Sequence, residues 1–123
     1  MLGKITDHNS DIICCILSDG ERTFHNLPDQ YELVDAEIVG EYAINMLRLM
    51  ESLADDVPEF DHLFLEYERH SLLAKKLDDG VLAVLNKPIS RLGLTKMEVG
   101  LNLYMKPLRR ALIEQPDPSE VPF

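Results

Sequence analysis

The stretch HLFLEYERHSLLAKKLDDGVLAVL, residues 62–85, decides the fold. In its first eight residues, leucine and tyrosine on one side alternate with glutamate on the other, which is typical of a strand. A turn leads into a second strand, which ends before Asp79 and Gly80, a pair that predicts a tight hairpin. Residues 81–85 are apolar without alternation, which indicates a central strand covered on both faces. The stretch therefore predicts three consecutive strands.

A second apolar run without alternation lies at residues 12–17. The Asp-Gly pair at 19–20 predicts another hairpin, with a return strand over residues 22–27. A two-residue turn there would place Cys14 opposite His25. A thiol beside an imidazole could be an activated nucleophile, but a buried, inert thiol is favoured because no third group completes such a site. We therefore expect no catalytic residues and no enzyme activity.

Two segments follow the helical period. The first covers residues 36–54, with Asp35 as its expected N-cap. The second begins at a capping box formed by Thr95 and Glu98, and its apolar stripe spans about 120° of a helical wheel. The stripe comprises Met97, Leu101, Tyr104, Met105, Leu108, Ala111 and Leu112. Pro107 lies inside this pattern and should kink or divide the helix.

The resulting order of elements is ββαβββα. It predicts an α/β fold with one mainly antiparallel five-stranded sheet, and the two fully apolar strands argue for helices on both faces. Residues 1–114 are expected to form a single domain. Residues 115–123 contain three prolines and two acids and are expected to form a disordered tail.

The first predicted helix is apolar over about half of its circumference, more than packing on a sheet requires. We expect one flank, with Ile38, Tyr42 and Leu49, to be exposed in a monomer. Leu47, on the opposite flank, is expected to be exposed as well. A large exposed apolar patch usually marks an interface, although a loop or a chain end could cover it.

The strand at 62–69 could pair with a second copy if it forms a sheet edge, whereas its charges could instead block pairing. A two-fold dimer would join strand and helix of both copies at one contact. The predicted homodimer interface comprises Ile38, Tyr42, Leu47, Leu49, Phe64, Glu66 and Glu68. A further protein partner is expected to contact Glu41, Ile44, Arg48 and Glu51.

Composition and motifs argue against several function classes. The 123 residues carry 22 acidic and 12 basic side chains, and this net charge of -10 disfavours nucleic acid and anionic membranes as partners. No apolar run could span a membrane and no signal-peptide pattern is present, so we expect a cytoplasmic protein without direct membrane insertion. No nucleotide-binding or nucleophile-elbow motif occurs, and no cofactor is expected. His62 and Glu66 would lie about 13 Å apart on a strand, too far to share a metal ion.

Several segments resemble the roadblock/dynein-light-chain family, within the longin-like group. Residues 62–68, 71–76 and 78–85 resemble the family's last three strands with their glycine-containing hairpin. Residues 89–94 resemble the approach to its terminal helix, and the resemblance as a whole covers residues 10–114. It implies a three-layer α/β/α domain and dimers that join edge strands into one sheet, with the middle helices side by side.

The resemblance also implies a function and raises one difference. Family members regulate or scaffold small Ras-like GTPases, or act as adaptors on motors or larger complexes, and are not enzymes by themselves. The family usually begins with a full helix, whereas only residues 1–11 precede the first strand here, so that helix is expected to be missing or shortened. The sheet face would then be open, or covered by the tail or a partner. An open face would leave a pocket beside the last helix, so the alternative function is a small-ligand sensor that holds a molecule between sheet and helix.

Overall fold

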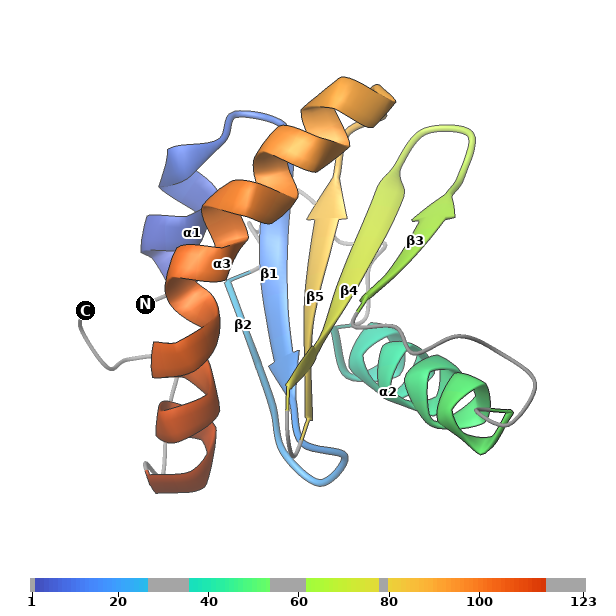
Figure 1. Ribbon diagram of the computed structural model, residues 1–123, viewed down its shortest axis with the longest axis vertical. Helices are drawn as coiled ribbons and strands as arrows, with labels where there is room; N and C mark the ends of the chain where they lie inside the picture. Colours follow the sequence, from blue (N-terminus) through green and yellow to red (C-terminus); the bar gives the residue numbers. More distant parts are fainter. Residues whose placement is uncertain (1, 27–35, 54–61, 78–79, 115–123) are drawn as a thin grey trace.

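The computed structural model describes residues 2–26, 36–53, 62–77 and 80–114 (Figure 1). In chain order the elements are α1 (Leu2–His8), β1 (Ile12–Ser18), β2 (Thr23–His25), α2 (Ala36–Ser52), β3 (His62–Glu66), β4 (Ser71–Leu77), β5 (Gly80–Asn86) and α3 (Arg91–Glu114). The strands lie in the order β2–β1–β5–β4–β3, and all neighbours are antiparallel. Helices α1 and α3 cover one face of this sheet and α2 covers the other (Figure 1). The predicted α/β class, with a five-stranded antiparallel sheet and helices on both faces, is confirmed.

The two central strands are β1 and β5, and every residue of both is buried. Their side chains alternate between two apolar clusters: Cys15 and Leu17 face α1 and α3, whereas Cys14 and Ile16 face α2. Each fully buried leucine or isoleucine contributes about 1.5–3 kcal/mol relative to an exposed one. Burial on both faces explains why neither strand shows the apolar–polar alternation of a half-covered strand.

Helix α1 is absent from the predicted order of elements. Leu2 and Ile5, 2% and 1% exposed, pack in the cluster beneath α3. A seven-residue helix offers only two such core positions, too few to make a recognisable period. The expectation that this sheet face is open, or covered only by the tail or a partner, is wrong, because α1 and α3 cover it (Figure 1). The first helix is therefore shortened rather than missing.

The β1–β2 turn is centred one residue later than predicted. Ser18 pairs with Thr23 and Ile16 with His25, and the backbone N–H of Asp19 donates to the Arg22 carbonyl. The central turn residues are thus 20 and 21, with Gly20 at a φ of 93°, a conformation that favours glycine. This shift moves the register by two residues, so the predicted pairing of Cys14 with His25 is wrong.

Helix α3 begins at Arg91, four residues before the predicted capping box. Ser90 is the N-cap, since its hydroxyl accepts the N–H of Gly93 at 3.1 Å. Thr95 lies inside the helix, where its hydroxyl donates to the Arg91 carbonyl at 3.0 Å. The predicted capping box is therefore wrong, because the true cap has glycine rather than glutamate at its third helical position.

The predicted apolar stripe of α3 is confirmed, since all seven of its side chains are buried. Pro107 does not divide the helix, which runs unbroken from Arg91 to Glu114 and bends over the sheet (Figure 1). The expected N-cap Asp35, the hairpin residue Asp79 and the tail 115–123 lie outside the described residues.

Candidate protein interface

Small side chains let α2 lie close to the sheet. A Cβ atom at Gly40 would meet the Cβ of Ser18 at 3.3 Å and the Cγ2 of Ile16 at 3.4 Å, so there is no room for a larger residue. The buried side chains next to it on α2 are Ala43, Ile44 and Leu47. This narrow contact leaves much of the helix surface outside the core.

An apolar row runs along the outer side of α2. Ile38 is 63% exposed, Leu49 55%, Tyr42 46% and Leu53 45%. Positions four or seven residues apart share one side of a helix, so Ile38, Tyr42 and Leu49 lie along one side of α2, with the exposed Asn45 between the last two. Leu53 follows directly after the end of the helix. The sequence predicted exposure of Ile38, Tyr42 and Leu49, and the structure agrees; their role in an interface stays a prediction.

Two other residues assigned to protein contacts are buried. Leu47 is 3% exposed and Ile44 is 5% exposed, and both belong to the cluster between α2 and the sheet. The expectation that Leu47 stays exposed is wrong, because α2 faces the sheet through positions 40, 43, 44 and 47. We therefore leave Leu47 and Ile44 out of the proposed dimer interface.

Strand β3 is the end strand on one side of the sheet, since it pairs with β4 and no other described strand. Leu63 and Leu65 face α2 and are half-buried, whereas Phe64 packs on the opposite face. Glu66 and Glu68 are exposed. The predicted strand over 62–69 is shorter in the structure, because a turn closed by the Tyr67 N–H and the His70 carbonyl follows Glu66.

Tyr67 follows directly after β3, is 54% exposed and interacts with Tyr42 of α2. Burial raises the pKa of Tyr67, and the charge and side-chain hydrogen bond of neighbouring Tyr42 raise that pKa further. The outer row of α2 therefore continues onto the edge strand as one surface. We name this surface the α2–β3 face: Ile38, Tyr42, Leu49, Leu53, Tyr67 and the edge of β3 that pairs with no other described strand.

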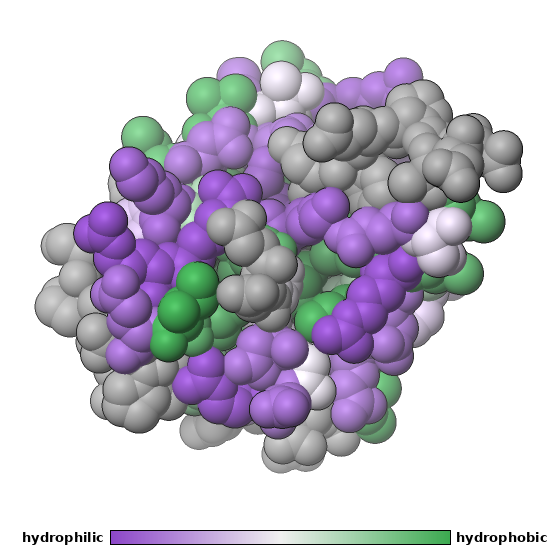
Figure 2. Space-filling view, turned by 60° about the horizontal axis from the view of Figure 1, so that its bottom comes forward, coloured by the Kyte–Doolittle hydropathy of each residue, from purple (hydrophilic) through white to green (hydrophobic). Residues whose placement is uncertain are grey.

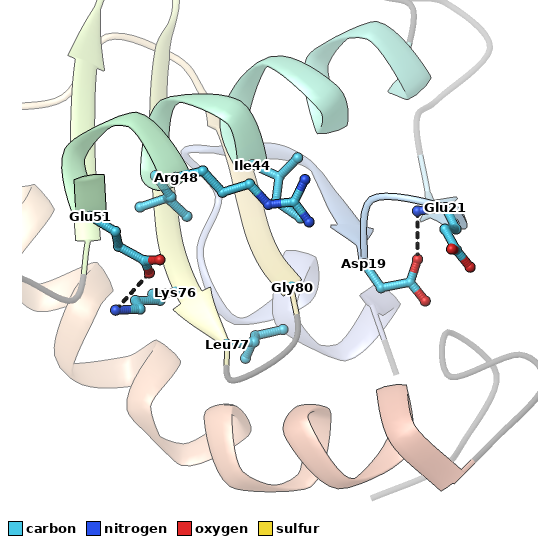
Figure 3. Close-up of a pocket in the computed structure, with 9 residues that line it drawn as sticks. Asp19, Glu21, Ile44, Arg48, Glu51, Lys76, Leu77 and Gly80 are labelled. Carbon is cyan, nitrogen blue, oxygen red and sulfur yellow. Dashed lines mark hydrogen bonds and ion pairs between the residues drawn. The ribbon is translucent and has the colours of Figure 1, made fainter.

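A hollow of about 440 Å³ lies beside the C-terminal half of α2, near the turn of the β1–β2 hairpin and near Leu77 and Gly80 of the β4–β5 hairpin (Figure 3). Its lining residues are Asp19, Glu21, Ile44, Leu47, Arg48, Glu51, Lys76, Leu77 and Gly80. Viewed from the end where these hairpins lie, the molecular surface is mostly hydrophilic, with some apolar side chains visible between polar ones (Figure 2). The hollow thus combines a charged rim with an aliphatic floor.

The charged side chains around the hollow differ in position: an ion pair lies at one side, and an arginine extends into the hollow. Glu51 pairs with Lys76 at 2.7 Å and closes one side. Arg48 extends into the hollow from α2, and its guanidinium reaches the Gly20 turn, where an added Cβ would meet Nη2 at 3.1 Å (Figure 3). Of the residues predicted to contact a partner, Arg48 and Glu51 therefore lie together here, whereas Glu41 is exposed outside the lining.

Asp19 is held by its own turn rather than offered to a ligand. Its carboxylate accepts the N–H groups of Glu21 and Arg22, at 2.9 and 2.6 Å, and pairs with the Arg22 side chain at 2.8 Å. Burial raises the pKa of Asp19, but these hydrogen bonds outweigh it and hold the pKa below its ordinary value. The sequence predicted a turn here but not its place at the rim, since the pairing of β1 with β5 and of β5 with β4 brings the turn and Lys76 to the same hollow.

The two thiols give no support to nucleophilic chemistry. Burial raises the pKa of Cys14 to about 11 and that of Cys15 to about 12. His25 is exposed and pairs with Ile16. An imidazole that activates the Cys14 thiol would have to lie opposite Cys14, two positions away. His62, the candidate metal ligand, instead places Nδ1 3.1 Å from Glu98. Within residues 2–26, 36–53, 62–77 and 80–114, no group of three His, Cys, Asp or Glu side chains could hold a metal ion.

Comparison with known proteins identifies the fold. No protein-family model and no curated protein matches the sequence. Among solved structures, Myxococcus xanthus MglB is similar over 89% of this chain and 89% of its own, with a TM-score of 0.69 and 18% sequence identity. This likeness supports the roadblock/longin-like fold. None of the described helices is both long enough and apolar enough to cross a membrane.

Proposed function

We propose that this roadblock/longin-like chain is a non-catalytic, homodimeric adaptor that regulates a small Ras-like GTPase. The observation that carries the proposal is the α2–β3 face, where an exposed apolar helix row adjoins a sheet edge. Monomeric proteins rarely leave a contiguous apolar surface open, and a free strand edge is a template for pairing. The GTPase part of the proposal comes from the family resemblance, which the shared fold supports.

The sequence of β3 suits antiparallel pairing with a second copy. A two-fold axis centred on Phe64 would place His62 of each copy opposite Glu66 of the other, and Leu63 opposite Leu65. Cross-strand pairs of apolar side chains, such as Leu63 with Leu65, stabilise such ladders by about 0.2–1 kcal/mol each. The same two-fold would bring the outer rows of the two α2 helices together, so that strand and helix contacts belong to one isologous interface.

Light scattering on the purified chain tests the dimer. We expect the wild type to have twice the 14.0 kDa of one chain. Replacing Tyr42 and Leu49 together by aspartate should weaken dimerisation at least about a hundredfold, because each buried apolar side chain contributes about 1.5–3 kcal/mol and every 1.4 kcal/mol is tenfold.

Val99→Asp is the matched control, since Val99 is also exposed, at 65%, but lies on α3 across the sheet. It should remain dimeric, and far-ultraviolet circular dichroism should show both variants folded. A wild type that stays monomeric at high concentration would contradict the proposed dimer.

The hollow at the end of α2 supplies the polar part of the proposed GTPase contact. We expect the dimer to bind at least one small Ras-like GTPase with an affinity that depends on the bound nucleotide, measured by calorimetry with GDP and with a non-hydrolysable GTP analogue. Arg48→Glu should weaken this binding at least tenfold, because it reverses a charge that reaches into the hollow. Lys87→Glu, an exposed reversal on the loop before α3, should leave binding unchanged. Equal affinities of wild type and Arg48→Glu would remove the hollow from the proposal.

A further inference from the structure

Gly100 is a helix residue that the fold does not explain. It lies inside α3, where glycine costs about 1 kcal/mol relative to alanine. Its φ is not positive, since Gly20 is the described glycine with that conformation. A Cβ atom at position 100 would meet nothing within 4 Å, in contrast to Gly40 and Gly80. Neither backbone geometry nor packing within the described chain therefore requires glycine here.

The missing side chain leaves a groove open between α1 and α3. The groove has a volume of about 110 Å³. Its lining residues are Ile5, Asn9, Ile12, Lys96, Met97, Gly100, Leu101, Leu103 and Tyr104. Pockets for small molecules usually measure about 300–1,000 Å³, so this groove is too small for a typical free ligand. Its size and apolar floor suit one apolar side chain of a protein partner, the kind of anchor that dominates binding energy.

Helix α3, which forms one wall of the groove, differs in charge sign from the rest of the protein. Helix α3 carries five basic and two acidic side chains, whereas the remainder of the chain carries seven basic and twenty acidic ones. One of those two acids, Glu98, is engaged by Lys75 and His62. The outward side of the helix, within about 80° of a wheel, comprises Leu92, Lys96, Val99, Leu103, Lys106 and Arg110. Leu92, Val99 and Leu103 are 65%, 65% and 76% exposed.

We propose that the α1–α3 groove is a docking site for an acidic segment of a partner protein, which inserts one apolar side chain beside Gly100. Lys96 lies at the groove itself, and Lys106 and Arg110 continue along the same side of α3, so acidic residues flanking the anchor would meet complementary charge. This site lies across the sheet from the α2–β3 face and is independent of the proposed dimer and GTPase contact.

The test is a selection from a displayed library of random 12-residue peptides against the immobilised full chain. We expect enriched peptides to be acidic around one leucine, isoleucine or phenylalanine. Synthetic copies should bind wild type and Gly100→Ala comparably, but bind Gly100→Leu at least tenfold more weakly, because leucine fills the groove. Lys96→Glu should weaken them by a similar factor. Binding should persist in the Tyr42→Asp/Leu49→Asp variant, which separates this site from the dimer interface.

Gly100→Leu should fold, since position 100 has open space, and its thermal unfolding should confirm that. Failure to enrich any peptide, or peptides that bind Gly100→Leu as well as wild type, would overturn the proposal. A parallel sedimentation assay uses vesicles of phosphatidylserine and phosphatidylcholine. Vesicle binding that Lys96→Glu abolishes, in the absence of peptide binding, would reassign the surface to a membrane and also overturn it.

Discussion

Replacing Gly80 by alanine should lower the free energy of unfolding by about 3 kcal/mol, at the upper end of the cost of overpacking a core. Gly80 is the first residue of β5, at a point where β1 and α3 both approach. An added Cβ would overlap the carbonyl oxygen of Ser18 and would lie 2.8 Å from Cδ2 of Leu112 and 3.1 Å from Cα of Asp19. Two of these three atoms are backbone and cannot rotate away, so the strands themselves must move.

Urea unfolding at a fixed protein concentration measures this effect, since dimerisation would make stability depend on concentration. Gly100→Ala is the matched control. Its Cβ meets open space in a helix, so we expect a gain of about 0.5–1 kcal/mol. The two glycine-to-alanine changes should thus have opposite signs. A loss below 1 kcal/mol for Gly80→Ala would mean that the approach of β1 to β5 is not fixed by this residue.

Gly80 illustrates what the sequence can and cannot predict. Its place after a run of aspartates correctly indicates a hairpin, because turn chemistry is local. Its contact with Ser18 depends on the pairing of β1 with β5, which are more than 60 positions apart, and no local pattern encodes that. The same holds for the hollow at the end of α2, where Asp19 and Lys76 line opposite sides of one cavity only because of the sheet order (Figure 3).

Periodicity predicts buried positions best where an element is long. The 24-residue helix α3 repeats its apolar stripe often enough that all seven predicted core positions are correct. In α1 only Leu2 and Ile5 are core positions, and two positions are too few to reveal a helical period, so this helix was not predicted. In α2 the apolar arc is wider than the contact with the sheet, and periodicity alone does not show which edge is covered. Leu47 proves buried while Leu49 is exposed, because Gly40 and Ala43 set which side of the helix approaches the sheet.

The place of a single turn residue can also change the register of two strands. The turn glycine, Gly20, occupies the first central position rather than the second, and this changes the β1–β2 register by two residues. Glycine suits either central position of a hairpin turn, so the Asp-Gly pair alone does not decide between the two registers. The preference is explained by the structure, in which the Asp19 carboxylate accepts two backbone N–H groups across the turn. These hydrogen bonds stabilise the later turn.

Glu98→Gln should destabilise the protein by about 3 kcal/mol, because it leaves a buried ammonium without its counter-charge. Lys75 is 3% exposed, and its Nζ lies 3.3 Å from Oε1 of Glu98. His62 Nδ1 lies 3.1 Å from the same oxygen, so one carboxylate serves two elements of the sheet. Removing one partner of a buried pair typically costs about 3–5 kcal/mol, and the lower end applies here because the Glu98 side chain is 27% exposed.

Lys75→Met should have a much smaller effect, within about 1 kcal/mol of wild type, because it removes the buried charge and fills the same space with an apolar chain. The double variant Lys75→Met/Glu98→Gln should then recover most of the stability that Glu98→Gln loses. Urea unfolding of the four proteins gives the coupling free energy, which we expect to be about 2 kcal/mol. Additive losses in the double variant would mean that the carboxylate stabilises the fold through His62 rather than through the buried lysine. The distinction matters for the proposed dimer, since His62 lies on the edge strand β3. If Glu98 acts mainly through His62, pairing of β3 with a second copy would be coupled to α3. If Glu98 acts mainly through Lys75, β3 could pair without a change in the core.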